Sequence, residues 1–290
     1  MNIVKKEILK EIYPQRPQEA HKYDYGLLVV IGGGQFYTGS PALSALAAFK
    51  AGVDMVHILA PKRAADIIAS FTPDLASYPL PGDIIRKKDL PILLTRIEGA
   101  KQVAHGKTAI VVGGGAGRSE ETKEVILELI ENTDVPMVID ADAIHAVSKK
   151  PEVLKGKKIV VTPHLYEFFV LTGKKVIDLK LEDRIKIVQE ETKRLETIIL
   201  LKGQYDIISQ GTDVFINETG SPYLTKGGTG DTLAGILGSL LAQGIDPLLA
   251  AQAAAYINGR AGEIAFEKYG VSLLATNLIE SIPQVIKEAL

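Results

Sequence analysis

The sequence predicts an α/β protein in which helices cover both faces of a mainly parallel sheet. Apolar runs of strand length alternate with helical patterns along most of the 290 residues, which is typical of a three-layer α/β/α arrangement. The first such run is continuously apolar, as expected for a strand buried on both faces. No repeat, low-complexity linker or charge run divides the chain, so we expect one domain over residues 1–290.

The predicted strands are short apolar runs, and several of them end in glycine. "GLLVVIGG" (26–33) is the first of these runs. Two alternating runs, 205–209 and 213–217, have Gly211 near their connection and predict a hairpin at an edge of the sheet. The strands expected in the parallel part of the sheet are 26–33, 53–60, 108–115, 136–142, 158–163 and 197–203.

The predicted helices carry recognisable start and stop residues. In "SPALSALAAFKAG", Ser40 can cap the helix, Pro41 suits its first turn, and Gly52 ends it. The alanine-rich segment 248–266 is expected to pack in the core. The expected helices are 40–52, 119–131, 142–148, 164–172, 180–195, 229–243, 247–268 and 276–288.

The composition excludes several classes of protein. With no cysteine, the chain has no disulfide scaffold, thiolate metal site or cysteine nucleophile. Its net charge of −2 indicates no global attraction to nucleic acid or to an anionic membrane. No apolar run is long enough to span a bilayer, and the first residues lack the apolar core of a signal peptide. We therefore expect a cytoplasmic protein without nucleic-acid or membrane partners.

Glycine clusters follow several of the predicted strands. In open parallel sheets, ligands bind beyond the carboxyl ends of the strands, so these clusters indicate where a ligand lies. Tight turns that need positive φ are the other explanation for any one cluster. The glycines concerned are Gly32, Gly33, Gly34, Gly113, Gly114, Gly115, Gly117, Gly203, Gly227, Gly228 and Gly230.

Common nucleotide fingerprints do not fit these clusters. "GGGQFYTGS" lacks the Lys-Ser/Thr end of a P-loop, and Tyr37 stands where the dinucleotide motif needs its third glycine. "GGGAGRS" fails in the same way at Arg118. The chain is therefore neither a Walker-type NTPase nor a standard dinucleotide-dependent dehydrogenase.

The segment "TKGGTGDTLAGILGSLLAQG" (225–244) predicts an anion site. Its glycines allow close approach of the backbone, and the N–H groups of 228–231 would point outward at the start of helix 229–243. Asp231 then lies in the first turn, where it either caps the helix or takes a proton from an attacking hydroxyl. Capping alone does not require three glycines, so we favour a phosphate site that ends in a base.

"GGTGDTLAG" resembles the glycine-aspartate signature of ribokinase-like enzymes. Further segments, in the expected order, resemble the ADP/ATP-dependent NAD(P)H-hydrate dehydratases. The resemblance implies a ribokinase-like fold. The matching segments are "YGLLVVIGGGQFYTGSPALSALAAFKAGVDMVHI" (25–58), "VVGGGAG" (111–117), "VIDADAIHAV" (138–147), "VTPHLYEFFVLTG" (161–173), "LLKGQYDII" (200–208) and "LLATNLIESIP" (273–283).

This family repairs NAD(P)H to which water has been added. The resemblance implies that ADP phosphorylates the hydroxyl of the (6S)-hydrate and that phosphate is then eliminated, giving NAD(P)H, AMP and phosphate. Some family members use ATP instead. Mg²⁺ would bridge the phosphates with few protein ligands. A kinase of the same fold acting on a small alcohol, such as a hydroxyethylthiazole or a hydroxymethylpyrimidine, is the alternative. A non-catalytic nucleotide sensor would need the glycines but not Asp231.

The resemblance assigns roles to individual residues. Asp231 would be the base at the hydrate hydroxyl, and Gly228 and Gly230 would form the anion hole. Three further residues fall where family members contact the hydrate: Ser40, Gly115 and His164. Together with Gly230, five consecutive residues would hold the adenine nucleotide: Lys202, Gly203, Gln204, Tyr205 and Asp206.

Several of these residues also have simpler explanations. His164 could only start a helix, and Asp140 with Asp142 could only cap helix 142–148. Lys202 could pair with a surface carboxylate. Asp140 and Glu167 are weaker candidates for organising Mg²⁺ through water, and no residue is expected as a direct metal ligand.

The chain also departs from the family pattern. Gly114 replaces a proline, Leu165-Tyr166 replaces Pro-Gly, Lys226 stands where threonine is common, and His145 replaces a frequent asparagine. The resemblance further implies a homo-oligomer, typically a tetramer. No epimerase segment precedes the matching part, so a separate NAD(P)H-hydrate epimerase is expected in the same pathway.

Overall fold

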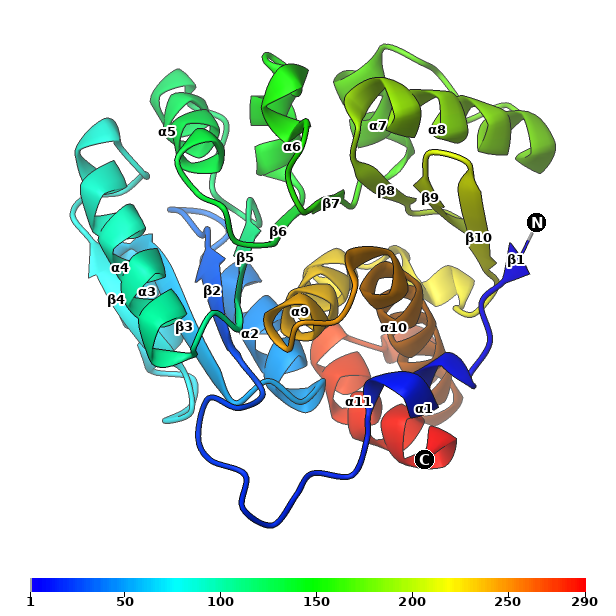
Figure 1. The fold of residues 1–290 in the computed structure, drawn as a ribbon, viewed down its shortest axis with the longest axis horizontal. Coiled ribbons are helices and arrows are strands. Elements are labelled where there is room, and N and C mark those ends of the chain that lie inside the picture. Colours follow the sequence, from blue (N-terminus) through cyan, green and yellow to red (C-terminus); the bar gives the residue numbers. More distant parts are fainter. Residues whose placement is uncertain (1) are drawn as a thin grey trace.

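The computed structural model describes residues 2–290, and its centre is a ten-stranded sheet. The strand order is β1-β10-β9-β8-β7-β6-β5-β2-β3-β4, and only the β8–β9 and β9–β10 pairs are antiparallel (Figure 1). The predicted mainly parallel sheet is therefore confirmed. The strands are β1 (Asn2–Ile3), β2 (Leu27–Ile31), β3 (Met55–Pro61), β4 (Ala76–Leu80), β5 (Thr108–Val112), β6 (Met137–Ile139), β7 (Ile159–Val161), β8 (Ile198–Leu201), β9 (Asp206–Gln210) and β10 (Asp213–Asn217).

Helices form a layer on each face of the sheet, as the predicted three-layer class requires (Figure 1). No helix among residues 2–290 is long and apolar enough to cross a membrane. One layer contains α1 (Ile8–Ile12), α2 (Ser40–Lys50), α3 (Lys62–Ala69), α9 (Thr229–Ala242), α10 (Pro247–Tyr269) and α11 (Ala275–Ala289). The other contains α4 (Leu90–Val103), α5 (Glu120–Glu131), α6 (Asp142–Val147), α7 (Leu165–Thr172) and α8 (Leu181–Leu195).

The structure adds elements that sequence patterns did not reveal. Between residues 61 and 107, where no element was predicted, the chain forms α3, β4 and α4. Strand β4 carries no apolar alternation because it is the outermost strand, and its Pro79 suits an edge position. At the opposite side of the sheet, β1 pairs in parallel with β10, so the predicted hairpin is present but is not itself the edge.

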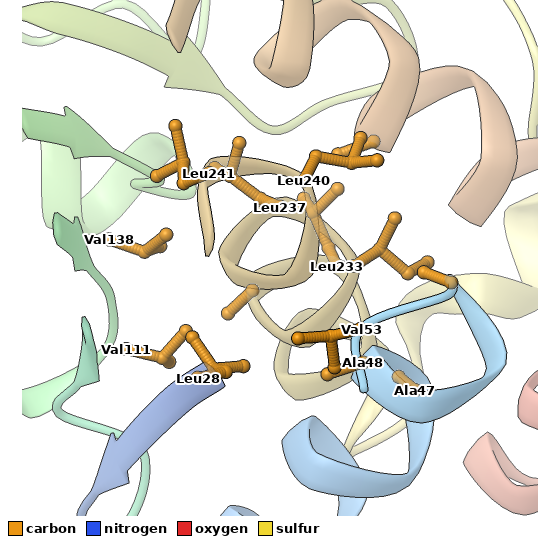
Figure 2. Packing of buried hydrophobic residues seen from close by; sticks show 14 of the residues in the cluster. Leu28, Ala47, Ala48, Val53, Val111, Val138, Leu233, Leu237, Leu240 and Leu241 are labelled. Carbon is orange, nitrogen blue, oxygen red and sulfur yellow. The ribbon is translucent and has the colours of Figure 1, made fainter. Parts of the chain in front are cut away.

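Helix α9 packs directly on the middle of the sheet. Its leucines, including Leu233, Leu237 and Leu240, belong to the same buried cluster as the strand residues Leu28 and Val111 (Figure 2). Each fully buried leucine stabilises the fold by about 2 kcal/mol. Glycines let the helix approach closely: a Cβ at Gly238 would lie 2.9 Å from Leu28 Cδ1. This packing fixes where the start of α9 lies, at the carboxyl ends of the strands.

Candidate active site

The glycine clusters meet at the carboxyl edge of the sheet, as predicted. The turns after β2 and β5 are joined by a hydrogen bond from the Gly33 N–H to the Gly114 carbonyl, 2.8 Å long. Gly33 has φ +77°, which favours glycine because it lacks a Cβ. Gly115 has φ +66°, and a Cβ there would lie 2.6 Å from the carbonyl oxygen of Tyr37. The glycines therefore bring loops from neighbouring strands into contact.

The start of α9 has the geometry of an anion site. Gly228 occupies the N-cap position with φ +96°, and a Cβ there would lie 2.7 Å from Leu43 Cδ1. Thr229 Oγ1 donates to the Leu224 carbonyl at 2.7 Å and holds the preceding loop. Within residues 2–290, the N–H groups of Gly228, Gly230 and Asp231 donate to no protein acceptor. These donors and the helix dipole together favour an anion in front of the helix.

Asp231 lies in the first turn of α9 and is partly buried. Its Oδ1 accepts a hydrogen bond from Ser40 Oγ, so α2 and α9 meet at this carboxyl group. Burial, the largest cause, and the nearby Asp140 raise the pKa of Asp231 to about 7, although Ser40 and Lys202 act to lower it. A carboxyl group that titrates near neutral pH suits a general base better than an ordinary aspartate does.

Lys202 sits in a cluster of buried polar groups rather than at the surface. Its Nζ lies 2.9 Å from Asp140 Oδ1 and 3.9 Å from Glu167 Oε2. Thr162 Oγ1 donates to the same Asp140 oxygen at 2.7 Å. Burial alone would lower the pKa of Lys202, but the Asp140 and Glu167 carboxylates raise it above its ordinary value. A Cβ on Gly230 would lie 3.4 Å from Lys202 Nζ, so this cluster adjoins the start of α9.

These contacts correct two of the simpler explanations. Asp140 does not cap helix α6, because its side chain accepts from Lys202 and Thr162, and Ala141 occupies the N-cap position without a side-chain hydrogen bond. Asp142 is also not a cap: its carboxylate accepts from the Gly117 N–H at 2.9 Å and from Arg118 Nε at 2.6 Å. Lys202 pairs with a buried carboxylate rather than a surface one.

The turn from 202 to 206 connects β8 to β9, and Gly203 and Gln204 are exposed on it. The Asp206 carboxylate accepts from the Gly203 N–H at 3.1 Å and from Asn217 Nδ2 at 3.0 Å. Burial raises the pKa of Asp206 to about 6, although these hydrogen bonds lower it. Asp206 therefore stabilises the turn through its hydrogen bond to Gly203. Tyr205, between Gln204 and Asp206, is half-buried.

Sequence reasoning did not identify Asn217, which is completely buried. Its amide group also donates to the Ala255 carbonyl at 3.2 Å and accepts from Thr219 Oγ1 at 2.9 Å. The only signal in the sequence is an asparagine at the end of a predicted strand, which is usually a turn residue.

His164 is the N-cap of α7, which agrees with its simpler explanation as a helix-start residue. Its Nδ1 accepts from the N–H groups of Tyr166 and Glu167, at 3.1 and 3.2 Å. Glu167 accepts in return from the His164 N–H at 2.9 Å, which completes a capping box. Because Nδ1 is an acceptor, the proton of a neutral ring is on Nε2, which lies 3.4 Å from Glu167 Oε1 on a half-exposed side chain.

Comparison with known proteins agrees with this geometry. A family described as NAD(P)H-hydrate dehydratase matches residues 28–284. An ADP-dependent (S)-NAD(P)H-hydrate dehydratase of Nitrosopumilus maritimus is 34% identical, with 97% of this chain and 95% of that protein covered. A bifunctional NAD(P)H-hydrate repair enzyme of Pyrobaculum aerophilum is 40% identical over 94% of this chain, which spans only about half (52%) of that relative.

Solved structures share the fold. The ADP/ATP-dependent NAD(P)H-hydrate dehydratase of Bacillus subtilis, co-crystallised with ATP and Mg²⁺, has a TM-score of 0.80 and 25% identity, covering 100% of this chain and 99% of that one. The predicted ribokinase-like architecture is confirmed. Family match, nearly full-length relatives and fold agree with the sequence resemblance, and the chain belongs to the NAD(P)H-hydrate dehydratase family.

Proposed function

We propose that this chain dehydrates (6S)-NAD(P)H hydrate at the expense of ADP, giving NAD(P)H, AMP and phosphate. One observation carries the proposal: a carboxyl group with a pKa of about 7, Asp231, lies beside backbone N–H groups that have no acceptor among residues 2–290. A base next to an anion site is what phosphoryl transfer to a hydroxyl group needs. The family supplies the identity of the hydroxyl compound.

The proposed roles follow the positions of the residues. The nucleotide lies along the turn from Lys202 to Asp206 and reaches Gly230. The phosphoryl group being transferred is held by the N–H groups of Gly228 and Gly230. Three residues face the hydrate: Ser40 at the start of α2, Gly115 after β5 and His164 before α7.

The reaction has two steps in this proposal. Asp231 takes the proton of the hydrate hydroxyl as its oxygen bonds to the β-phosphorus of ADP, and the bond from that phosphorus to the bridging oxygen breaks to release AMP. The ring nitrogen lone pair then forms a double bond toward the ring carbons, the carbon–oxygen bond breaks, and inorganic phosphate leaves. Loss of a ring proton completes NAD(P)H. The hydrate oxygen ends in phosphate, so the atoms balance.

Mg²⁺ would neutralise phosphate charge in the first step. Among residues 2–290 no group of three or more acidic or histidine side chains could hold a metal ion. The nearby carboxylates of Asp140 and Glu167 both interact with Lys202. They fit an ion that is bound mainly by phosphate oxygens and reached by these two side chains through water.

Absorbance at 340 nm tests the proposal, because NAD(P)H absorbs there. The full chain is mixed with Mg²⁺ and NADH hydrate or NADPH hydrate, and ADP or ATP is added in parallel. We expect a rise that depends on nucleotide and is faster with ADP, together with AMP and phosphate in equal amounts. Faster reaction with ATP would correct the choice of nucleotide only.

The alternatives give different results in the same experiment. No rise with any hydrate, while a small alcohol becomes phosphorylated, would replace the proposal by the kinase of the same fold. Nucleotide binding without turnover of any substrate would indicate a sensor. Asp231→Asn is the control, since it removes the proposed base without changing the size of the side chain.

We also propose the setting in which this reaction occurs. A separate NAD(P)H-hydrate epimerase would supply the reactive (6S)-epimer in the cytoplasm, and the dehydratase would act as a homotetramer. The bifunctional name of relatives such as the Pyrobaculum aerophilum protein supports the link between two repair activities. Light scattering of the purified chain tests the assembly, and a monomer would contradict it.

A further inference from the structure

The contact between α2 and α9 is concentrated on Asp231. Ser40 Oγ donates to its side-chain Oδ1, and Ser44 Oγ, one turn further along α2, donates to its main-chain carbonyl at 2.9 Å. Gly235, one turn further along α9, lies so close to the Ser44 backbone that any side chain would collide with it. Helix α2 therefore fixes both the backbone and the carboxyl group of Asp231.

Gly114 makes this contact possible. A Cβ at position 114 would lie 2.7 Å from Asp231 Oδ1 and would also collide with Ser40 Oγ. The backbone there is held in place, because the Gly114 carbonyl accepts from the Gly33 N–H. Gly114 is the position where the family pattern has proline. In this chain, the absence of a side chain there leaves room for the Ser40–Asp231 hydrogen bond.

A serine hydroxyl has one proton to donate. In this structure Ser40 gives that proton to Asp231 Oδ1, so toward a bound substrate its oxygen can act only as an acceptor. The hydrogen bond stabilises the ionised carboxylate, because a carboxylate is a stronger acceptor than a carboxylic acid. The other carboxylate oxygen, Oδ2, accepts no hydrogen bond from the described part of the chain and can receive a proton from elsewhere.

We propose that Ser40 is a positioning residue that orients Asp231 through Oδ1 and keeps it ionised as the base, and that Gly114 provides the space for this. The inference rests on the proposed function, in which Asp231 takes the hydroxyl proton. It adds a role for Ser40 that differs from direct recognition of the hydrate.

Charged groups on several elements act on Asp231 beside Ser40. Asp140, at the end of β6, and Asp142, at the start of α6, raise its pKa, and Lys202, at the end of β8, lowers it. Burial is the largest influence and brings the pKa to about 7. Near neutral pH, the loss of one stabilising hydrogen bond therefore decides whether the ionised or the protonated form predominates.

The test measures the ionisation of Asp231 in the full chain without relying on turnover. The side-chain carboxyl carbon is followed by ¹³C NMR over a pH series, and its signal is identified by its absence in Asp231→Asn. In Ser40→Ala we expect the midpoint of titration to rise by about one pH unit. Ser40→Thr keeps the hydroxyl and should leave the midpoint close to that of the unmodified chain. Gly114→Ala should raise the midpoint as Ser40→Ala does.

An unchanged midpoint in Ser40→Ala would overturn the inference, and so would a rise of equal size in Ser40→Thr. The pH dependence of kcat/KM gives a second measurement: its acidic limb should move to higher pH by the same amount, with activity largely restored at high pH. A uniform loss of activity at all pH values would mean that Ser40 only binds substrate. If the NMR midpoint moves while no hydrate is dehydrated, the proposed function fails and the positioning role stands.

Discussion

The candidate site has two walls, one formed by the start of α9 and one by the strand ends that carry Lys202 and Asp206. They differ in whether their polar groups have hydrogen-bond or ion-pair partners within the protein. At the start of α9, backbone N–H groups of Gly228, Gly230 and Asp231 have no acceptor within residues 2–290. On the facing wall, formed by the ends of β6 and β8 and the start of β9, Lys202 and Asp206 both have protein partners. The first wall therefore has hydrogen-bond donors free for a ligand, whereas the charged side chains of the second wall are already paired within the protein.

The difference has a physical meaning. Unsatisfied donors cost free energy unless water or a ligand accepts from them, so their retention at one wall supports the proposed anion site. Buried charges that are already paired, such as Lys202, are expected to hold the shape of the site more than to bind a ligand. We expect substitutions at α9 to reduce catalysis and substitutions on the facing wall to reduce stability.

The largest effect should come from Asp231→Asn. The amide cannot accept the hydroxyl proton, so kcat should fall by about 10³-fold, the middle of the range for a lost general base. ADP affinity, measured by calorimetry, should change by no more than about twofold because no phosphate donor is removed. Retention of normal kcat would remove Asp231 from the mechanism.

Gly228→Ala should have the next largest effect. The position has φ +96°, and the new Cβ would lie 2.7 Å from Leu43 Cδ1 and 2.9 Å from Ala275 Cβ, so the loop must move and misplace the anion donors. We expect kcat to fall by about 10²-fold, as when one such donor is lost.

Gly227→Ala is the matched control for this change. Its Cβ would meet no atom of residues 2–290 within 4 Å, and its φ is not in the left-handed region. Activity close to that of the unmodified chain is expected. Equal losses in both variants would show that the loop tolerates no substitution, and the argument from Gly228 would fail.

On the facing wall, Lys202→Met should reduce stability. It leaves the carboxylate of Asp140, which is 3% exposed, without its cation, and removing one partner of a buried pair costs about 3 kcal/mol. Denaturant unfolding measures this. The exposed pair of Lys149 and Glu120 provides the control, because Lys149→Met should cost less than about 1 kcal/mol.

The smallest effect concerns pH. Burial raises the pKa of Asp231 to about 7 and that of Asp206 to about 6, above their ordinary 3.8. The unfolded chain releases these protons near pH 4, whereas the folded chain keeps them until pH 6 to 7. Between those values the folded state binds more protons, so these groups lower the free energy of unfolding as pH rises.

Asp231→Asn should therefore gain stability relative to the unmodified chain as pH rises from 4 to 7. Denaturant unfolding of the two chains at several pH values measures the difference. A difference that stays constant with pH would contradict the raised pKa of Asp231.

Much of the fold could be predicted because it depends on local patterns. Apolar runs such as 108–112 depend only on residues that are close together in the sequence. The predicted cap Ser40 was wrong: Gly39 occupies the N-cap position of α2, and the Ser40 side chain donates to Asp231 instead. Strand β4 was missed because it is the outermost strand and only its last residue, Leu80, is buried. Helices α3 and α4 each bury only three residues.

The sequence by itself determined the α/β class, the glycine turns and the aspartate at the start of α9, since each depends on neighbouring residues. Only the tertiary structure decided which side chains meet. Ser40 and Asp231 are 191 positions apart, Lys202 and Asp140 are 62 apart, and Asn217 supports Asp206 across the hairpin. The order of strands in the sheet and the packing of α2 against α9 bring these groups together, and no local periodicity specifies that order.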